Sequence, residues 1–180
     1  LLQELQKEIV EHTFNMISVD GDTSTNDTVL VMANAMSGCK KIQEKDRDYE
    51  AFREGLLYVN RELAKQIAGD GEGCTKLFEV HVEGADTKEN ARILSKSVVT
   101  SSLTKAAIYG KDANWGRILC ALGYSGVNFD PEKVDIAFES AAGTIDIVKD
   151  GIAADYSEEE ATKILSEEKV TAKIHVHNGE

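Results

Sequence analysis

Apolar residues recur at helical spacing in two parts of the first half of the chain. Leu2, Leu5 and Ile9 follow one another at three- and four-residue steps, which predicts an amphipathic helix over residues 1–14. The clearest helical pattern covers residues 46–68. Its apolar positions are Tyr49, Phe52, Leu56, Val59, Leu63 and Ile67.

Between these helices the chain is apolar on both sides of a polar stretch. Residues 15–19 alternate as a short strand would, and residues 28–36, "TVLVMANAM", are almost continuously apolar. We expect a buried helix over 28–36 that ends at Gly38.

The second half of the chain predicts a mixture of strands and helices. Residues 76–84 and 170–176 alternate like strands, and "VDIAFES" and "GTIDIVKDG" form a strand pair joined near Ala142. Thr87 is suited to cap a helix, Gly123 closes a shorter one, and Ser157 with Glu160 forms a capping box. Because the order lacks a regular βαβ rhythm, we expect an α/β (α+β) layered sandwich with a mixed sheet.

Composition narrows the class of protein. The chain has 180 residues, 42% of them hydrophobic, and a single proline, Pro131. We therefore predict no firm internal domain boundary, with a subdivision near 126–132 as the alternative. The net charge of −12 disfavours nucleic acid as a partner. No apolar run is long enough to cross a membrane.

Three cysteines occur without a metal-binding or paired spacing. Cys39, Cys74 and Cys120 are expected to be reduced, small buried residues, which points to a cytoplasmic protein. The chain opens on "LLQELQKE" without methionine and stops at "KIHVHNGE", so we also expect a fragment at both ends.

Residues 19–28, "VDGDTSTNDT", are the first candidate site. Their alternating oxygen-bearing side chains resemble a calcium loop, but Thr25 and Val31 stand where that loop needs glycine and glutamate. One interpretation is that this bend caps the following helix. The other, which we favour, is that it lines a ligand site. The candidate site-lining residues are Asp20, Asp22, Ser24, Thr25 and Asn26.

The glycine-rich stretch "GDGEG" at 69–73 is the second candidate. It is no dinucleotide loop, because Lys76 replaces the third glycine and a helix precedes it. A flexible connection explains the glycines, but Glu72 between two of them could accept hydrogen bonds from an amine or amide.

Other polar motifs favour structural roles. In "AIYGKDANWGR", Trp115 is expected in the core, Asn114 as a helix cap and Arg117 paired with a carboxylate. His175 and His177 share a strand face, but without a third ligand we predict no metal site. No nucleophile of a recognised kind is present in the chain.

Three motifs together resemble one family. "SVDGDTSTNDT", "GDGEGCTK" followed by "VEGA", and "AIYGKDANWGRI" are similar, in matching order, to the β chain of ornithine acetyltransferase (glutamate N-acetyltransferase) of arginine biosynthesis. Cys74 stands where alanine is more usual in that family.

The resemblance implies a self-cleaving enzyme related to the N-terminal-nucleophile class. In such an enzyme an acetyl group passes from N-acetylornithine to a threonine at the new N-terminus of the β chain and then to glutamate. Some members also accept acetyl-CoA, and no cofactor is expected. The resemblance implies an α chain from the same precursor, with αβ units assembled into α2β2 or larger. It places Glu72 in the substrate-binding set and the nucleophilic threonine ahead of Leu1, so that no catalytic residue lies in this chain.

Two other functions remain open at this point. A self-cleaving aminopeptidase or amidohydrolase of related architecture is the enzyme alternative. A non-catalytic amino-acid-binding subunit is the other, and it would be stable and bind its ligand alone. The acetyltransferase interpretation instead expects this chain alone to expose a large apolar face.

Overall fold

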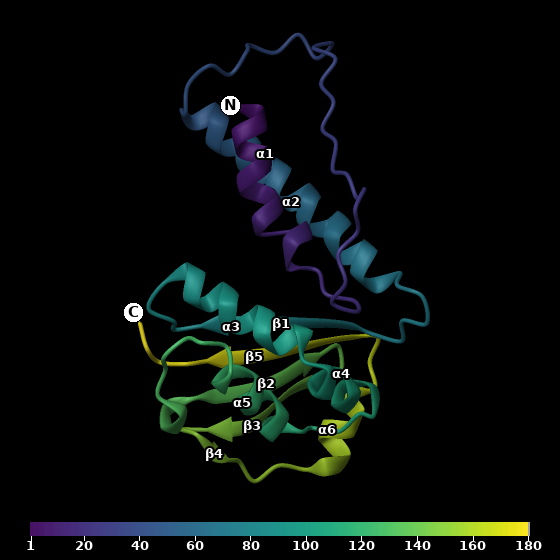
Figure 1. The fold of residues 1–180 in the computed structure, drawn as a ribbon, viewed down its shortest axis with the longest axis vertical. Helices are drawn as coiled ribbons and strands as arrows, with labels where there is room; N and C mark the ends of the chain where they lie inside the picture. The colour runs from purple at the N-terminus through teal and green to yellow at the C-terminus, as the bar shows by residue number, and fades with distance from the viewer. Residues whose placement is uncertain (180) are drawn as a thin grey trace. The chain divides into compact units, whose positions relative to one another are not determined.

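The computed structural model describes residues 1–179 and divides into two compact units, residues 1–71 and 72–180 (Figure 1). Residues 126–132, where a subdivision was an alternative, lie inside the second unit.

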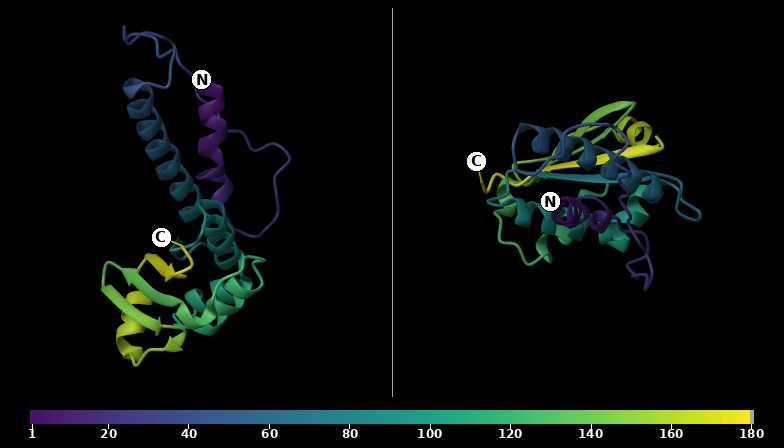
Figure 2. Two further views of the ribbon diagram at one scale, coloured as in Figure 1. Left: turned by 90° about the vertical axis from the view of Figure 1, so that its left-hand side faces the viewer. Right: turned by 90° about the horizontal axis from the view of Figure 1, so that it is seen from above.

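The first unit is built on two packed helices, α1 (Leu2–Glu11) and α2 (Arg47–Gly69), which lie side by side in Figure 2. Asp46 begins α2 by accepting a 3.0 Å hydrogen bond from the Tyr49 N–H. Leu5, Ile9 and Tyr49 form the small core between the helices. Both helices were predicted, and the stripe from Leu5 to Ile9 is buried as expected.

Polar contacts hold the two helices in register. The Arg53 guanidinium lies 2.7 Å from the Glu8 carboxylate, and Gln6 donates a 2.8 Å hydrogen bond to Asn60. Asn60 is buried, so this amide pair satisfies a polar group that would otherwise be costly to bury.

The connection from residue 17 to residue 45 contains no helix or strand. The predicted strand over 15–19 is wrong, since residues 14–16 form a short 3-10 helix, η1 (Phe14–Met16). The predicted buried helix over 28–36 is also wrong, because those residues are exposed and irregular. A strand needs a hydrogen-bonding neighbour, and the first unit supplies none in the described chain.

The second unit contains a five-stranded mixed sheet in the order β1-β5-β2-β3-β4. The strands are β1 (Leu77–Glu83), β2 (Asp135–Ser140), β3 (Gly143–Lys149), β4 (Ile152–Ala153) and β5 (Lys169–His175). β1 pairs with β5 in parallel, and every other pair is antiparallel. The α/β architecture with a mixed sheet is therefore confirmed.

Four helices supply the other side of the core. They are α3 (Lys88–Thr100), α4 (Ser102–Tyr109), α5 (Trp115–Gly123) and α6 (Glu158–Leu165), and a 3-10 turn, η2 (Pro131–Lys133), precedes β2. Alternate residues of β5, from Val170 to Ile174, are buried with Phe138 of β2 and Leu94 of α3 in one cluster. The other positions of the central strands β5 and β2 are polar, except for the half-buried Ala137. This pattern is expected for a sheet with one open face.

Local sequence signals set the ends of these helices. Each of the four helices begins at a side-chain N-cap, which accepts a hydrogen bond from the backbone N–H three residues later. The pairs, in chain order, are Thr87 with Asn90, Ser101 with Thr104, Asn114 with Arg117 and Ser157 with Glu160. The caps at Thr87, Asn114 and Ser157 were predicted and are confirmed, whereas α4 was missed.

Two side-chain predictions are corrected. Arg117 donates a 2.9 Å hydrogen bond to the Leu103 carbonyl and not to a carboxylate, because α4, which begins at Ser102, packs against α5. Cys39, Cys74 and Cys120 are exposed and not buried, since each lies in a loop or on an outward helix face. Trp115 packs, half-buried, against the main core as expected.

Candidate functional site

The polar bend at residues 20–28 is held by hydrogen bonds among its own groups. Asp20 accepts a 2.8 Å bond from the Asp22 N–H, across Gly21, whose φ of +93° only glycine adopts readily. The Ser24 hydroxyl donates to Asn26 Oδ1 at 2.9 Å and accepts from the Asn26 N–H at 3.3 Å. The sequence thus produces two consecutive side-chain turns.

These bonds decide against the helix-capping interpretation. No helix begins between residues 20 and 46 of the described chain, and α2 is capped by Asp46. The bend is exposed throughout, so its carboxylates, hydroxyls and amide are available to a ligand or another chain. The structure keeps Ser24 and Asn26 together, while Asp20 and Asp22 form the neighbouring turn.

Glu72 lies in the connection between α2 and β1. Its side chain is exposed, and Gly73 beside it has a φ of +69°, with no atom within 4 Å of the position that a Cβ would take. Glycine on each side leaves the backbone accessible, as the sequence suggested. Glu72 belongs to the second unit and the bend to the first, so their participation in one cavity stays a prediction.

Lys76 anchors the loop that carries Glu72, a role that sequence reasoning missed. Its ammonium donates a 3.1 Å hydrogen bond to the Glu167 carbonyl, just before β5. Burial lowers the pKa of Lys76, and the Lys111 charge adds to this effect. Lys76 ends the "GDGEGCTK" motif, so its place in that motif was the available signal.

The two histidines make local hydrogen bonds at the end of β5, where His175 Nδ1 accepts a 3.2 Å bond from the His177 N–H. His175 ends β5 and His177 follows it at a φ of +48°, with the two ring centroids 3.8 Å apart. His177 Nε2 lies 3.0 Å from Asp135 Oδ2. Across residues 1–179, no group of three His, Cys, Asp or Glu side chains is placed to hold a metal ion.

Among the described helices, none is both long and apolar enough to span a membrane.

Comparison with known proteins decides the family. The ArgJ family model matches residues 1–180, the whole chain. The chain belongs to the ArgJ family. It is 49% identical over 179 residues to "Arginine biosynthesis bifunctional protein ArgJ 1" of Clostridium acetobutylicum, and 47% identical over 178 residues to the ArgJ protein of Thermotoga neapolitana. Each match covers 99% of this chain.

A crystal structure of the ArgJ protein of Bacillus halodurans shares the fold. It superposes with a TM-score of 0.93 at 45% identity, covering 99% of this chain and 82% of that one. The resemblance drawn from the three motifs and the layered fold class are confirmed. The chain spans 44% and 45% of the length of the two curated ArgJ relatives.

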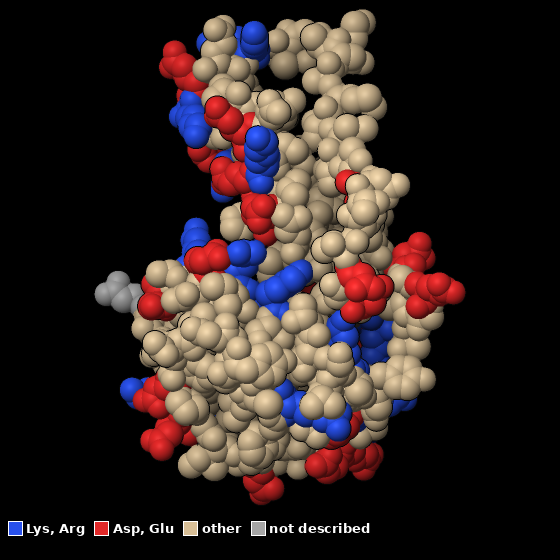
Figure 3. All heavy atoms as spheres, in the orientation of Figure 1, with Lys and Arg blue, Asp and Glu red and all other residues tan. Residues whose placement is uncertain are grey.

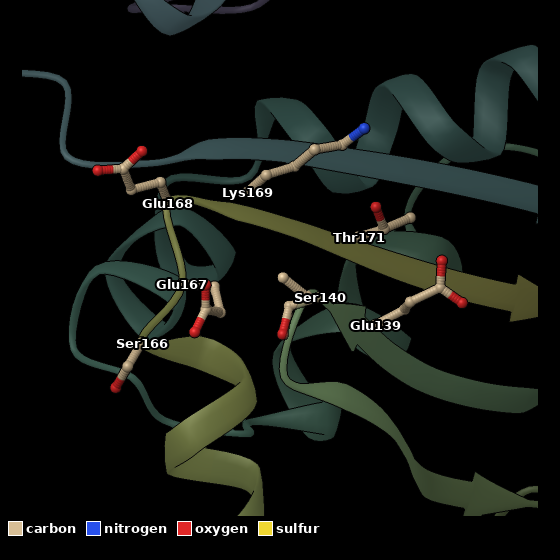
Figure 4. A pocket seen from close by; sticks show the side chains of 8 residues that line it. Glu139, Ser140, Ser166, Glu167, Glu168, Lys169 and Thr171 are labelled. Atoms are coloured by element: carbon tan, nitrogen blue, oxygen red, sulfur yellow. The ribbon is translucent and has the colours of Figure 1, made fainter.

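One hollow of about 580 Å³ lies in the second unit of this ArgJ-family chain, where the β2–β3 turn meets the start of β5 (Figure 4). Glu139, Glu167, Lys169 and Thr171 are among its lining residues, and none of the predicted site residues is. Glu139 pairs with Lys173, and Lys169 lies 3.2 Å from Glu79. Because these charges are matched on the open sheet face, we assign this hollow no role.

Proposed function

We propose that the chain is part of an enzyme that transfers acetyl from N-acetylornithine to glutamate through an acetyl-threonine intermediate. The observation that carries the proposal is the ArgJ family match over all 180 residues. It is supported by relatives whose names place them in arginine biosynthesis as bifunctional proteins. We call the complete ArgJ polypeptide that includes residues 1–180 the family-length protein.

The proposed reaction has two acyl transfers. A threonine hydroxyl, supplied from outside residues 1–180, attacks the acetyl carbonyl while the threonine's own α-amine accepts its proton. The C–N bond breaks, ornithine leaves with the returned proton, and an acetyl ester remains. The α-amine of glutamate then attacks this ester, which releases N-acetylglutamate and restores the hydroxyl.

Glu72 is proposed to hold the nitrogen of the substrate. A carboxylate is a strong acceptor for an amide N–H or an ammonium group. Its exposed side chain and the open backbone of Gly73 leave room for a ligand to approach. Fixing the nitrogen would direct the acetyl carbon toward the threonine, and orientation of this kind contributes about 7–11 kcal/mol to barrier lowering in the best cases.

The bend at 20–28 is proposed to order groups around the nucleophile. Ser24, Thr25 and Asn26 offer hydroxyl and amide groups that can both donate and accept hydrogen bonds. The two hydrogen bonds that join Ser24 to Asn26 pre-set the orientation of these side chains. Asp20 and Asp22 would supply negative charge near the α-amine that takes up the proton.

The rest of the catalytic machinery is proposed to come from an α chain of the same precursor, in αβ units assembled as α2β2 or larger in the cytoplasm. Acetyl-CoA is a second acetyl donor in this proposal, and no cofactor takes part.

Assays of the family-length protein test the proposal. Incubation with N-acetylornithine and glutamate should yield N-acetylglutamate and ornithine in equal amounts, and acid quenching should trap acetyl on a threonine by intact mass. A reaction with acetyl-CoA and glutamate tests the second donor. Peptide or amide hydrolysis without N-acetylglutamate would replace the proposal with the amidohydrolase alternative.

A further inference from the structure

Glu72 lies in a segment that belongs to no helix or strand. Residues 72–75 are exposed, and β1 begins only at Leu77. Gly71 and Gly73 flank Glu72, and glycine restricts the backbone less than any other residue. The direction of the Glu72 carboxylate therefore depends on what holds the far end of residues 72–76, which we call the Glu72 loop.

Two hydrogen bonds attach this end of the Glu72 loop to the link between α6 and β5. At the start of β1, the Leu77 N–H donates to the Glu168 carbonyl at 2.7 Å. One residue earlier on each side, the Lys76 ammonium donates to the Glu167 carbonyl at 3.1 Å. Figure 4 shows Glu167 and Glu168 in this link, beside the segment that leads into β1. The Lys76 side chain thus attaches the loop ahead of the first backbone pair.

The backbone of Lys76 is attached inside the loop as well. The Cys74 thiol donates a 3.1 Å hydrogen bond to the Lys76 carbonyl. A path of contacts therefore runs from Glu167 through Lys76 to Cys74, which is two residues from Glu72. Because each residue spans at most about 3.6 Å, a shift at Lys76 is readily passed to Glu72.

A lysine is a costly residue at this place. Its ammonium is half-buried, and burial lowers the pKa of Lys76. The charge of Lys111 lowers this pKa further, and the Glu167 carboxylate offsets the two effects only in part. Elsewhere over the second unit, Lys and Arg side chains lie interspersed with Asp and Glu side chains (Figure 3). A charge that is placed against these costs points to a function and not to stability alone.

We infer that Lys76 is a positioning residue for the acetyl transfer, which holds the Glu72 loop against the α6–β5 link so that the Glu72 carboxylate meets the substrate nitrogen in one orientation. This inference rests on the proposed role of Glu72. Lys76 touches no reacting atom and acts only through the position of Glu72. Hydrogen bonds from a charged donor are about twice as strong as neutral ones, so an ammonium is suited to hold a loop of this kind.

Steady-state kinetics of the family-length protein test this role. Lys76→Met keeps an aliphatic side chain but removes the donor. It should lower kcat with N-acetylornithine about tenfold and change KM less than about threefold, because orientation is lost and no contact with the substrate is removed. Lys76→Arg keeps a charged donor and should restore kcat to within about threefold of the parent. Lys169→Met is the matched control, since the Lys169 ammonium pairs with Glu79, and its kcat should be parental.

A double-variant cycle separates positioning from a general loss of stability. Glu72→Gln removes the carboxylate that Lys76 positions, so adding Lys76→Met to it should cause less than about a twofold further loss of kcat. Equal proportional losses in the Glu72→Gln and parental backgrounds would overturn the inference, because Lys76 would then act independently of Glu72. Parental kcat in Lys76→Met would overturn it as well.

Hydrogen exchange measures the attachment without any reaction. The Leu77 amide should exchange at least about tenfold faster in Lys76→Met than in the parent, while the Ile174 amide within β5 should be unchanged. An unchanged rate at Leu77 would contradict the inference. Faster exchange at Ile174 too would mean that the variant is unfolded, and Lys76→Gln, which keeps a polar side chain, then takes its place in every assay.

These outcomes separate the inference from the proposed function. A parental family-length protein that transfers no acetyl removes the proposed reaction, and the inference with it. Acetyl transfer that falls in Glu72→Gln but not in Lys76→Met keeps the reaction and removes the inference alone.

Discussion

Ser24 and Asn26 bind each other twice: the hydroxyl donates to the Asn26 side-chain oxygen at 2.9 Å, and the Asn26 N–H donates back to the hydroxyl at 3.3 Å. The pair fixes the geometry of an exposed bend that supports no helix or strand of its own unit. Because these polar side chains contribute little to packing, we interpret the bend as a binding surface and not as an element that stabilises the fold.

We expect Asn26→Ala in the family-length protein to lower acetyl-transfer turnover by at least about tenfold. The free energy of unfolding should change by no more than about 0.5 kcal/mol, because the side chain is exposed and lies outside the core. Steady-state kinetics and denaturant unfolding measure the two effects on the same preparation.

Asn34→Ala is the matched control for this substitution. Asn34 is exposed in the same irregular segment, and its side-chain oxygen accepts a 3.1 Å bond from the Met36 N–H. It should retain parental turnover. If Asn26→Ala lowered only the stability, or if both variants lost turnover equally, the bend would have no specific part in catalysis.

Glu72→Gln should reduce kcat/KM for the acetyl-donor substrate by about 10- to 100-fold, the loss expected for a charge-assisted hydrogen bond of about 1.5–3 kcal/mol. The fold should be unaffected, since Glu72 is exposed. Asp70→Asn serves as the control, because Asp70 is an exposed acid in the same loop at the C-cap of α2. Equal losses in both variants would indicate a general charge effect and would remove Glu72 from the site.

The second unit was largely readable from the sequence because its elements carry local signals. Side-chain caps begin α3, α5 and α6, and the alternation from Val170 to Val176 matches a strand with one buried face. α4 was missed because Ser101 is both the C-cap of α3 and the N-cap of α4, so no loop separates the two helices in the sequence. The Ser101 hydroxyl does accept a 3.2 Å bond from the Thr104 N–H.

The first unit was less predictable because its apolar runs depend on partners distant in sequence. Periodicity cannot separate a buried helix from a buried strand in a short run such as 28–36, and neither forms without a covering surface. The cysteines show the same limit: a residue type that is usually buried is exposed at Cys39, Cys74 and Cys120. The motifs identify candidate site residues in each unit, and the participation of Glu72 and residues 20–28 in one cavity stays a prediction.

Asp135 predicts a pH dependence of stability in the second unit. Burial alone would raise the pKa of this carboxyl, but the Lys149 ammonium at 2.5 Å, the Asp150 N–H and His177 lower the pKa from 3.8 to about 2. Because the folded-state pKa is below the ordinary value, the carboxylate stabilises the fold above about pH 4. This contribution disappears as the pH falls toward 2.

Asp135→Asn should therefore lower the free energy of unfolding by about 1 kcal/mol at pH 7, a value reduced for solvent screening of the exposed Lys149. The difference from the parent chain should shrink below about pH 3. Urea unfolding followed by Trp115 fluorescence reports on the second unit that contains both residues. Asp146→Asn, on the exposed side of β3, should show no such pH-dependent difference; a constant gap for Asp135→Asn across the pH range would contradict the ion-pair explanation.

Gly151 closes the turn between β3 and β4 in a conformation and a space that only glycine fits. Its φ is +71°, and its N–H donates a 2.9 Å hydrogen bond to the Val134 carbonyl at the start of β2. An added Cβ would overlap the Pro131 carbonyl oxygen and lie 2.6 Å from Glu132 Cα. Both are backbone atoms of η2, so the clash cannot be relieved by turning a side chain.

Gly151→Ala should therefore destabilise the second unit by about 3 kcal/mol or more, since the left-handed backbone costs about 1–2 kcal/mol and the overlap adds to it. Gly126→Ala is the matched control: its φ is +84°, but nothing lies within 4 Å of the added carbon, so only the backbone cost of about 1–2 kcal/mol should appear. Urea unfolding of the two variants measures the difference. Equal destabilisation of the two variants would show that η2 can move away from the added carbon at little cost. The close approach of residues 131–132 to the β3–β4 turn would then not position the start of β2.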